Sequence, residues 1–250
     1  GLSPWMQKLP GGLIHVNVVG CALFAAISGS SAATVATVGK MSIPELRKRK
    51  YPEKILLGSL AGSGTLGLLI PPSIILIIYG VTVQESIAKL FIAGIIPGIM
   101  IALIFMSYVI IWSLINKKSM PKYVENFSFL EKIKKSKQLL PVIILISAVI
   151  GSIYTGVATA TEAASLGVVG ALILSYFQKS LTIKTFKQSL LGATKTSCMI
   201  AFILAGSTFL SLAMGFTGLP RNLAIWIQNM ELSPYVLIFV LMIFYIILGM

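Results

Sequence analysis

The chain has 250 residues, of which 56% are hydrophobic and only 11% charged, and its formal net charge is +13. A soluble domain carries about 25% charged residues, so this composition excludes an ordinary soluble protein, because there is too little charge to cover a surface in water. We therefore expect an all-α integral membrane protein, with room for about six to eight membrane segments at roughly 20 residues per span.

The positive charge lies in short segments between apolar runs, at 40–54, 117–137 and 179–195, while the intervening turns are nearly neutral. This is the positive-inside pattern, and it predicts that the three basic segments are cytoplasmic. Nucleic-acid binding is disfavoured, because it needs a basic stripe on a soluble face. Cys21 and Cys198 have no second Cys or His at ligand spacing, which argues against a zinc site or a disulfide framework.

The first apolar run, 9–39, is flanked by Lys8 and Lys40 on the same expected side. It is too long for one helix across roughly 30 Å of hydrocarbon and too short for two, so it predicts a re-entrant hairpin entering from the cytoplasm. At the tip, small residues offer carbonyl and hydroxyl oxygens to a cation, although close helix packing through small residues is an equal alternative. These tip residues are Ser28, Gly29, Ser30 and Ser31. His15, in the first arm, is expected to be packed or interfacial rather than a proton relay.

The next apolar run, 55–80, contains the pair Pro71-Pro72 after four glycines. Proline removes a backbone donor and disfavours helix in the residue before it, so this run predicts a discontinuous helix. Secondary transporters place substrate and ion sites at such breaks. A membrane span at 90–116 follows and completes a first portion, 1–116.

A basic linker, 117–138, separates this portion from a second one, 139–250. Pro121 and the apolar residues Phe127, Phe129, Leu130 and Ile133 predict an interfacial helix on anionic lipid. Similar amphipathic stretches are expected along the bilayer surface at 83–90, 181–191 and 221–230. The second portion contains the charge-free runs 138–161 (which begins at the last linker residue), 163–178, 196–220 and 232–250.

Glu162 is the only acid between two long charge-free runs, and an intramembrane carboxylate is a functional-site hypothesis by default. Thr159 and Glu162 also have capping-box spacing, so Glu162 can equally close the start of a helix at the outer interface. The sequence leaves both interpretations open.

Residues already named also allow two other interpretations, an intramembrane protease and an ABC permease. The stretch Ala26-Ile27-Ser28-Gly29 is similar to the Gly-x-Ser-Gly box of rhomboid intramembrane serine proteases, but that chemistry needs a later histidine as base, and none follows His15. Glu162-Ala163-Ala164 with Gly167 faintly resembles the coupling loop of ABC permeases, which is polar and cytoplasmic, unlike this stretch. We therefore expect no enzymatic activity.

Several motifs in fixed order extend through nearly the whole chain: Pro10-Gly11-Gly12-Leu13, the stretch 23–33 around the hairpin tip, Gly67-Leu68-Leu69-Ile70-Pro71-Pro72-Ser73-Ile74, Ile78-Tyr79-Gly80, the stretch 90–98 and Thr159-Ala160-Thr161-Glu162-Ala163-Ala164. In this order they resemble the large membrane subunit (DctM-type) of the tripartite ATP-independent periplasmic (TRAP) transporters. Ala160 stands where the family often has Pro, and Thr34 where many members have Asp. The chain looks like a fragment lacking both ends, its second portion truncated at the second hairpin.

The resemblance implies an elevator-type fold of two inverted repeats, in the bacterial inner membrane. It implies sodium-coupled uptake of a small organic acid, of the C4-dicarboxylate or sialic-acid class, with no cofactor other than Na⁺ as the coupling ion. The expected partners are a small TRAP membrane subunit and a periplasmic or extracellular solute-binding protein. A sodium-coupled dicarboxylate or citrate carrier without a binding protein is the alternative.

The resemblance also implies the site residues, all as hypotheses. Oxygens of one set would bind Na⁺: Ser28, Ser30, Gly62, Ser63, Gly64 and Thr65. Hydroxyls, amide groups, helix N-termini and one carboxylate would face the substrate: Ser28, Gly29, Ser30, Ser31, Thr65, Ser73 and Glu162. Pro71 and Pro72 would hold the helix break.

Overall fold

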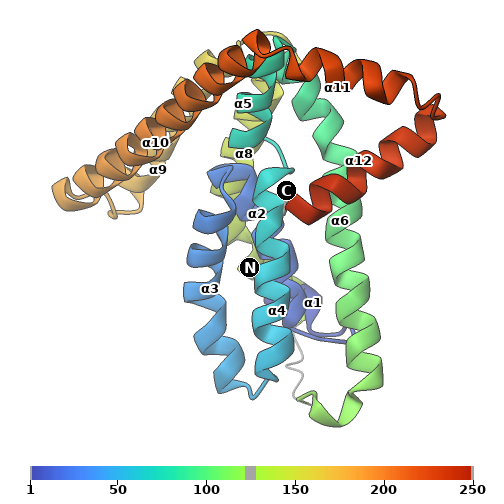
Figure 1. Cartoon of the computed structure of the whole chain (residues 1–250). Helices are drawn as coiled ribbons and strands as arrows, with labels where there is room; N and C mark the ends of the chain where they lie inside the picture. The colour runs from blue at the N-terminus through green and yellow to red at the C-terminus, as the bar shows by residue number, and fades with distance from the viewer. Residues whose placement is uncertain (1, 122–127, 249–250) are drawn as a thin grey trace. The chain divides into compact units, whose positions relative to one another are not determined.

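The computed structural model describes residues 2–121 and 128–248, and in these two ranges the chain forms only α-helices, short 3-10 helices and connecting turns. The chain forms two compact units, Gly1–Gln178 and Lys179–Met250. Figure 1 follows the helices in chain order. The first unit contains α1 (Ser3–Met6), α2 (Ile14–Ser28), α3 (Ser31–Lys48), α4 (Glu53–Gly64), η1 (Thr65–Leu68), α5 (Ile74–Val83), α6 (Ile87–Ile115), η2 (Lys117–Ser119), α7 (Phe129–Ser136), η3 (Lys137–Leu139), α8 (Leu140–Tyr154) and α9 (Ala160–Phe177).

Helices α2 and α3 form a helical hairpin that packs against α4. α2 ends at Gly29, whose φ of 57° is left-handed and suits glycine. α3 begins after Ser30, whose side chain accepts a hydrogen bond from the Ala33 N–H. The hairpin predicted over 9–39 thus has helical arms at 14–28 and 31–48.

The second arm is longer than its apolar composition predicts, because it continues through Pro44 into the basic segment. Leu46, near its end, is 2% exposed and packs in a cluster with Ile55, Leu56 and Val109. Continuing the helix to Lys48 buries this leucine, and this packing outweighs the cost of one proline in the helix.

The run 55–80 is interrupted in the structure. α4 ends at Gly64, a 3-10 turn follows to Leu68, residues 69–73 are non-helical and α5 restarts at Ile74. The Pro71-Pro72 peptide bond is cis. The predicted amphipathic stretch 83–90 is not a separate element, because Gln84 turns the chain and Ser86 caps α6 directly.

The linker is described only in part. η2 ends at Ser119, and α7 begins with a capping box made by Ser128 and Glu131. The residues between 122 and 127, including the predicted apolar position 127, lie outside the described ranges. α7 meets α8 at an angle of 57°. Beyond it, α8 and α9 pack together, and Phe91 of α6 forms a buried cluster with Ile153 and Ala163.

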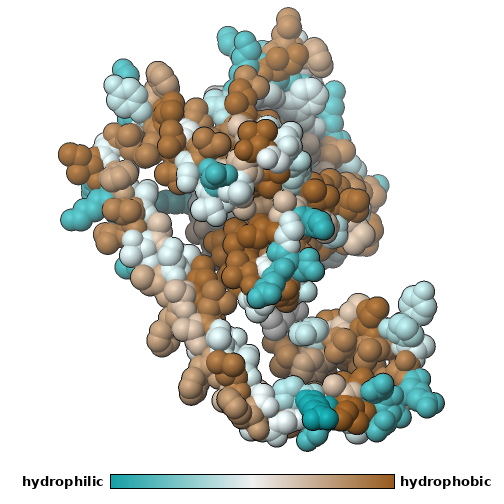
Figure 2. All heavy atoms as spheres, turned by 90° about the horizontal axis from the view of Figure 1, so that it is seen from above, coloured by the Kyte–Doolittle hydropathy of each residue, from teal (hydrophilic) through white to brown (hydrophobic). Residues whose placement is uncertain are grey.

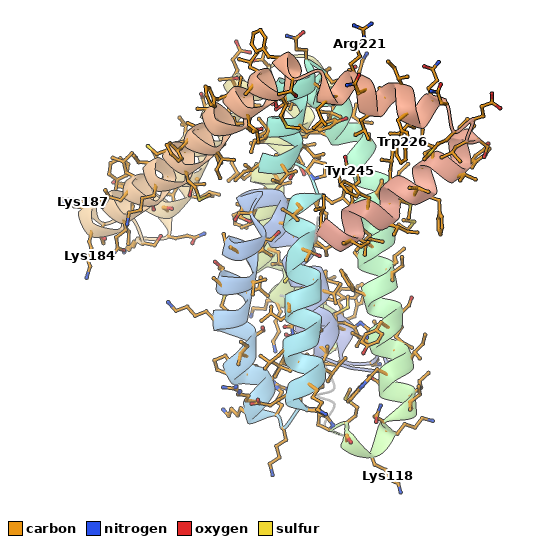
Figure 3. The ribbon with its side chains drawn as sticks, in the orientation of Figure 1. Lys118, Lys184, Lys187, Arg221, Trp226 and Tyr245 are labelled. Atoms are coloured by element: carbon orange, nitrogen blue, oxygen red, sulfur yellow. The ribbon has the colours of Figure 1, made fainter. Side chains whose placement is uncertain are left out.

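The second unit consists of α10 (Ile183–Phe216), α11 (Leu219–Gln228) and α12 (Pro234–Leu248). The separate stretch predicted at 181–191 is wrong, because it joins the apolar run behind it in one 34-residue helix that contains no proline. The stretch at 221–230 does form its own helix, α11, after Gly218. In Figure 3, Arg221 points away from α12, whereas Trp226 lies on the side of α11 that faces α12.

In the described ranges, α6, α9 and α10 are long and apolar enough to cross a membrane, and the bent pair α7 and α8 would be a fourth span. This is fewer than the six to eight segments expected, because α2, α5 and α12 are apolar but short. Hydrophobic side chains predominate on the face that Figure 2 shows, with hydrophilic ones in small groups. Such a surface is compatible with lipid and not with water.

Candidate functional site

The hairpin tip and the helix break meet through their backbones. The N–H of Ile74, the first residue of α5, donates a hydrogen bond of 3.3 Å to the carbonyl of Gly29. A Cβ atom on Gly29 would lie 2.9 Å from the carbonyl oxygen of Pro72. Two segments that the sequence marked separately are therefore one junction, which we call the tip–break junction (residues 28–34 and 66–74).

Gly67 brings the other side of the break against the tip. A Cβ atom there would lie 2.9 Å from the carbonyl carbon of Ser30 and from the amide nitrogen of Ser31. These neighbours are backbone atoms and cannot rotate away, so only glycine permits this approach. The N-termini of α3 and α5 both lie at this junction, and helix N-termini favour anions.

Hydroxyl and carbonyl oxygens gather at the tip. Ser28 Oγ lies 2.9 Å from Thr34 Oγ1, and the carbonyl of Ser30 accepts from Thr34 Oγ1 at 2.8 Å and from Ser28 Oγ at 3.2 Å. Thr34 is fully buried. Thr34 was not among the residues predicted to bind ion or substrate, and the structure makes it part of this oxygen cluster.

Two further hydroxyls of the junction differ in their bonding. Ser73 is fully buried and donates to the carbonyl of Leu68 at 2.6 Å, which closes the break onto itself. The Oγ of Ser31 is buried and has no hydrogen-bond partner among the described residues. A buried hydroxyl without a partner is costly, so Ser31 is a position where a bound ion, water or substrate oxygen would be stabilising.

The four residues predicted to bind Na⁺ at the end of α4, Gly62 to Thr65, contact different parts of the structure. A Cβ on Gly62 would meet the Phe105 ring of α6 at 3.2 Å, and one on Gly64 would collide with Val35 of α3. Ser63 Oγ is buried and bonds back to the carbonyl of Ser59 at 2.5 Å. Thr65 is exposed, and its hydroxyl donates to the carbonyl of Gly62 at 2.7 Å. Gly64 lies close to the tip, with its Cβ position 3.8 Å from the Ser31 carbonyl oxygen.

Glu162 is exposed at the start of α9. Its carboxylate accepts hydrogen bonds of 2.8 Å from both the N–H and the hydroxyl of Thr159, and the Glu162 N–H donates back to that hydroxyl. This is a complete capping box. The structure thus shows the capping role that the sequence allowed, and substrate contact by Glu162 is the alternative that a Glu162→Gln variant tests.

A buried amide ties the hairpin to α4. Asn17 is fully buried in α2, and its Nδ2 donates to Ser59 Oγ at 3.1 Å and to the carbonyl of Leu56 at 3.3 Å. Sequence reasoning missed this residue, although an asparagine within an apolar run was a visible signal. In the described part of the chain, His, Cys, Asp and Glu nowhere gather in groups of three or more, so a cation held at the junction would use hydroxyl and carbonyl oxygens.

The family model for the tripartite ATP-independent periplasmic transporter DctM component matches residues 6–250. The chain belongs to this family. It is 34% identical over 240 residues to the C4-dicarboxylate TRAP transporter large permease protein DctM of Pseudomonas aeruginosa, covering 96% of this chain and 56% of that protein.

Two other relatives carry different substrate names. The sialic acid TRAP transporter large permease protein SiaM of Vibrio cholerae is 33% identical over 244 residues, 96% of this chain and 56% of that protein. The isethionate TRAP transporter permease protein DctMQ of Oleidesulfovibrio alaskensis is 34% identical over 223 residues, 88% of this chain and 34% of that protein. This DctM-family chain spans about half the length, or less, of the relatives it matches.

Family membership and the apolar helices together make this chain an inner-membrane protein. The three relatives described above are named as permeases, not as enzymes. This agrees with the expectation from sequence, in which the serine-protease interpretation lacked a base.

Proposed function

We propose that this chain forms the transporting core of a binding-protein-dependent secondary transporter that takes up small organic acids together with Na⁺. The observation that carries the proposal is the tip–break junction, where the Ile74 N–H bonds to the Gly29 carbonyl. Interrupted helices expose carbonyls and helix N-termini at membrane depth, which suits coupled binding of a cation and an anion.

The tip oxygens fit Na⁺ as a cosubstrate. Ser28 Oγ, Thr34 Oγ1 and the Ser30 carbonyl lie within hydrogen-bond distance of one another, and hard cations prefer oxygen ligands of this kind. The partnerless Ser31 hydroxyl adds an oxygen whose burial a ligand would compensate. The hydroxyls of Ser63 and Thr65 donate to the carbonyls of Ser59 and Gly62, so Gly62, Ser63, Gly64 and Thr65 are proposed to contribute through their carbonyls.

For the substrate we propose a small organic anion. The relatives are named for C4-dicarboxylates, sialic acid and isethionate, and the converging N-termini of α3 and α5 suit an anionic group. We propose that the hairpin is re-entrant, that it moves with the broken helix in an elevator cycle, and that a small membrane subunit and a solute-binding protein complete the transporter.

The test is uptake of a labelled organic acid into proteoliposomes that contain the complete transporter. We expect uptake to require both an inward Na⁺ gradient and the binding protein. Uptake at the same rate without the binding protein would support the carrier alternative instead, and uptake without Na⁺ would refute the coupling.

Single-residue variants localise the ion site. Ser28→Ala and Ser31→Ala are expected to raise the Na⁺ concentration for half-maximal uptake severalfold. The matched control is Ser107→Ala, because Ser107 is exposed on α6 and bonds only back to its own helix at Leu103. If all three variants behave alike, the tip is not the ion site.

A further inference from the structure

Trp5 stands at the centre of a small aromatic and basic cluster in the first unit. Its indole N–H donates to Ser136 Oγ at 2.9 Å, and the Phe129 ring packs edge-on against it with centroids 6.2 Å apart. The Lys132 ammonium lies 5.3 Å from the centre of the Trp5 ring, a cation–π arrangement. α1 and α7 are thereby joined, although they are far apart in the sequence.

An apolar groove of about 460 Å³ begins beside this cluster. Leu2 and Ser3, at the start of α1, line one part of it, only a few residues from Trp5. The hairpin contributes Val16 and Phe24, and the η3–α8 segment contributes Leu139 and Val142, directly after α7. Groove and cluster are therefore neighbours along the chain twice, at residues 2–5 and at residues 136–139.

The charge around the cluster favours an anion. α7 and η3 carry four lysines, Lys132, Lys134, Lys135 and Lys137, against the single acid Glu131. The carboxylate of Glu131 is engaged in capping α7, where it accepts from the Ser128 N–H at 2.9 Å. The one carboxylate that lines the groove, Glu45, is paired with Arg49 at 2.6 Å, so it opposes an anion less than a free acid would.

We propose that one anionic phospholipid occupies this site, with its phosphate at Lys132 and Trp5 and an acyl chain in the groove. The lining of the groove is mostly apolar, which suits an acyl chain. Burial of its methylenes against Val16, Phe24 and Val142 is favourable, and lysines near the bilayer surface attract anionic headgroups. The site lies outside the tip–break junction and does not depend on the proposed transport function.

Trp5 itself is the probe. The full-length transporter is reconstituted in phosphatidylcholine bilayers that contain increasing fractions of brominated phosphatidylglycerol or brominated phosphatidylcholine, and tryptophan quenching is recorded. The Trp5→Phe variant, measured in parallel, gives by difference the signal of Trp5 alone. We expect half-maximal quenching of Trp5 at a severalfold lower fraction of the anionic lipid. Equal quenching by the two lipids would overturn the proposal, because it would indicate only general lipid contact.

Four variants separate a specific site from general attraction. Lys132→Gln is expected to weaken the preference for the anionic lipid roughly fivefold, the effect of one lysine near an anionic surface, and Lys132→Arg to retain it. Lys134→Gln removes the same charge from the opposite side of α7 and is the matched control. Val142→Phe, which fills the groove from α8, should reduce quenching by the anionic lipid. Equal effects of the two glutamine variants, or no effect of Val142→Phe, would refute the site.

Discussion

Asn17 of α2 and Ser59 of α4 are joined by a buried hydrogen bond of 3.1 Å between Nδ2 and Oγ. Because Nδ2 also donates to the Leu56 carbonyl, the first arm of the hairpin is fastened to the helix that leads into the break. The relative position of tip and break therefore depends on a contact well away from the junction itself.

Replacing Asn17 by Ala is expected to lower the stability of the folded transporter by about 1 kcal/mol, because it removes an interhelical bond and leaves a buried hydroxyl without its donor. The measurement is the thermal unfolding midpoint in detergent. Asn222→Ala, at an exposed position of α11, is the control and should leave the midpoint unchanged. A midpoint for Asn17→Ala equal to that of the control would show that the amide contributes nothing.

Gly67→Ala is expected to abolish uptake, or to reduce it at least tenfold. The new Cβ would lie 2.9 Å from backbone atoms of Ser30 and Ser31, so the tip would have to move away from the break. Gly58→Ala is the matched control in the preceding helix, because nothing lies within 4 Å of its Cβ position. Alanine there should be neutral or stabilising by up to about 1 kcal/mol. Normal uptake by Gly67→Ala would disprove the close approach.

Two variants of Thr34 separate the effect of its hydroxyl on Na⁺ binding from the effect of its side-chain volume. Thr34→Val keeps the volume but removes the oxygen near Ser28 and the Ser30 carbonyl, so the Na⁺ dependence of uptake should weaken severalfold. Thr34→Ser retains the oxygen and should keep the dependence near that of the wild type. The reverse order of the two variants would mean that Thr34 matters only through packing.

Variants of Thr159 and Glu162 test whether helix capping is the role of the Glu162 carboxylate. Glu162→Gln should retain both stability and uptake, because glutamine can take the same place in a capping box. Thr159→Ala should lower the unfolding midpoint, because it removes the group that bonds the Glu162 N–H. Loss of uptake in a normally stable Glu162→Gln variant would assign the carboxylate to the substrate instead.

Tyr51, in the basic segment between α3 and α4, predicts how the stability of the protein depends on pH. Its hydroxyl accepts from the Leu13 N–H at 3.0 Å, and burial raises the pKa of Tyr51 above its ordinary value. Folding favours the neutral form of Tyr51. Its contribution to the free energy of unfolding is therefore complete below about pH 10 and is lost as the pH rises through the raised pKa. Tyr51→Phe should cost about 1 kcal/mol near neutral pH and should remove this alkaline loss from the unfolding midpoint.

Much of the fold could be predicted from sequence because interruptions have local causes. Gly29 and the Pro71-Pro72 pair forbid or disfavour regular helix at their own positions, so both breaks were visible in the residues. Helix lengths were less predictable, since they depend on contacts at a distance. α3 continues to Lys48 because Leu46 is buried against α4, and residues 183–216 form one helix although its polarity changes along its length.

The residues alone predicted the site only as two motifs, and it was the family resemblance that placed tip and break in one site. The bond from Ile74 to Gly29 joins residues whose proximity no periodicity indicates, and the role of Gly67 appears only when its missing Cβ is set against Ser30. Spacing predicted the capping box of Glu162 and Thr159 correctly, because that motif lies within one turn of one helix.

The junction also has a consequence for biogenesis. α2, α3, α4 and α5 are consecutive in the chain, so every backbone group that meets at Gly29, Gly67 and Ile74 emerges from the ribosome before α6 is complete. The exposed polar backbone of the two interruptions can thus be shielded by its own neighbours during insertion, without waiting for the later spans.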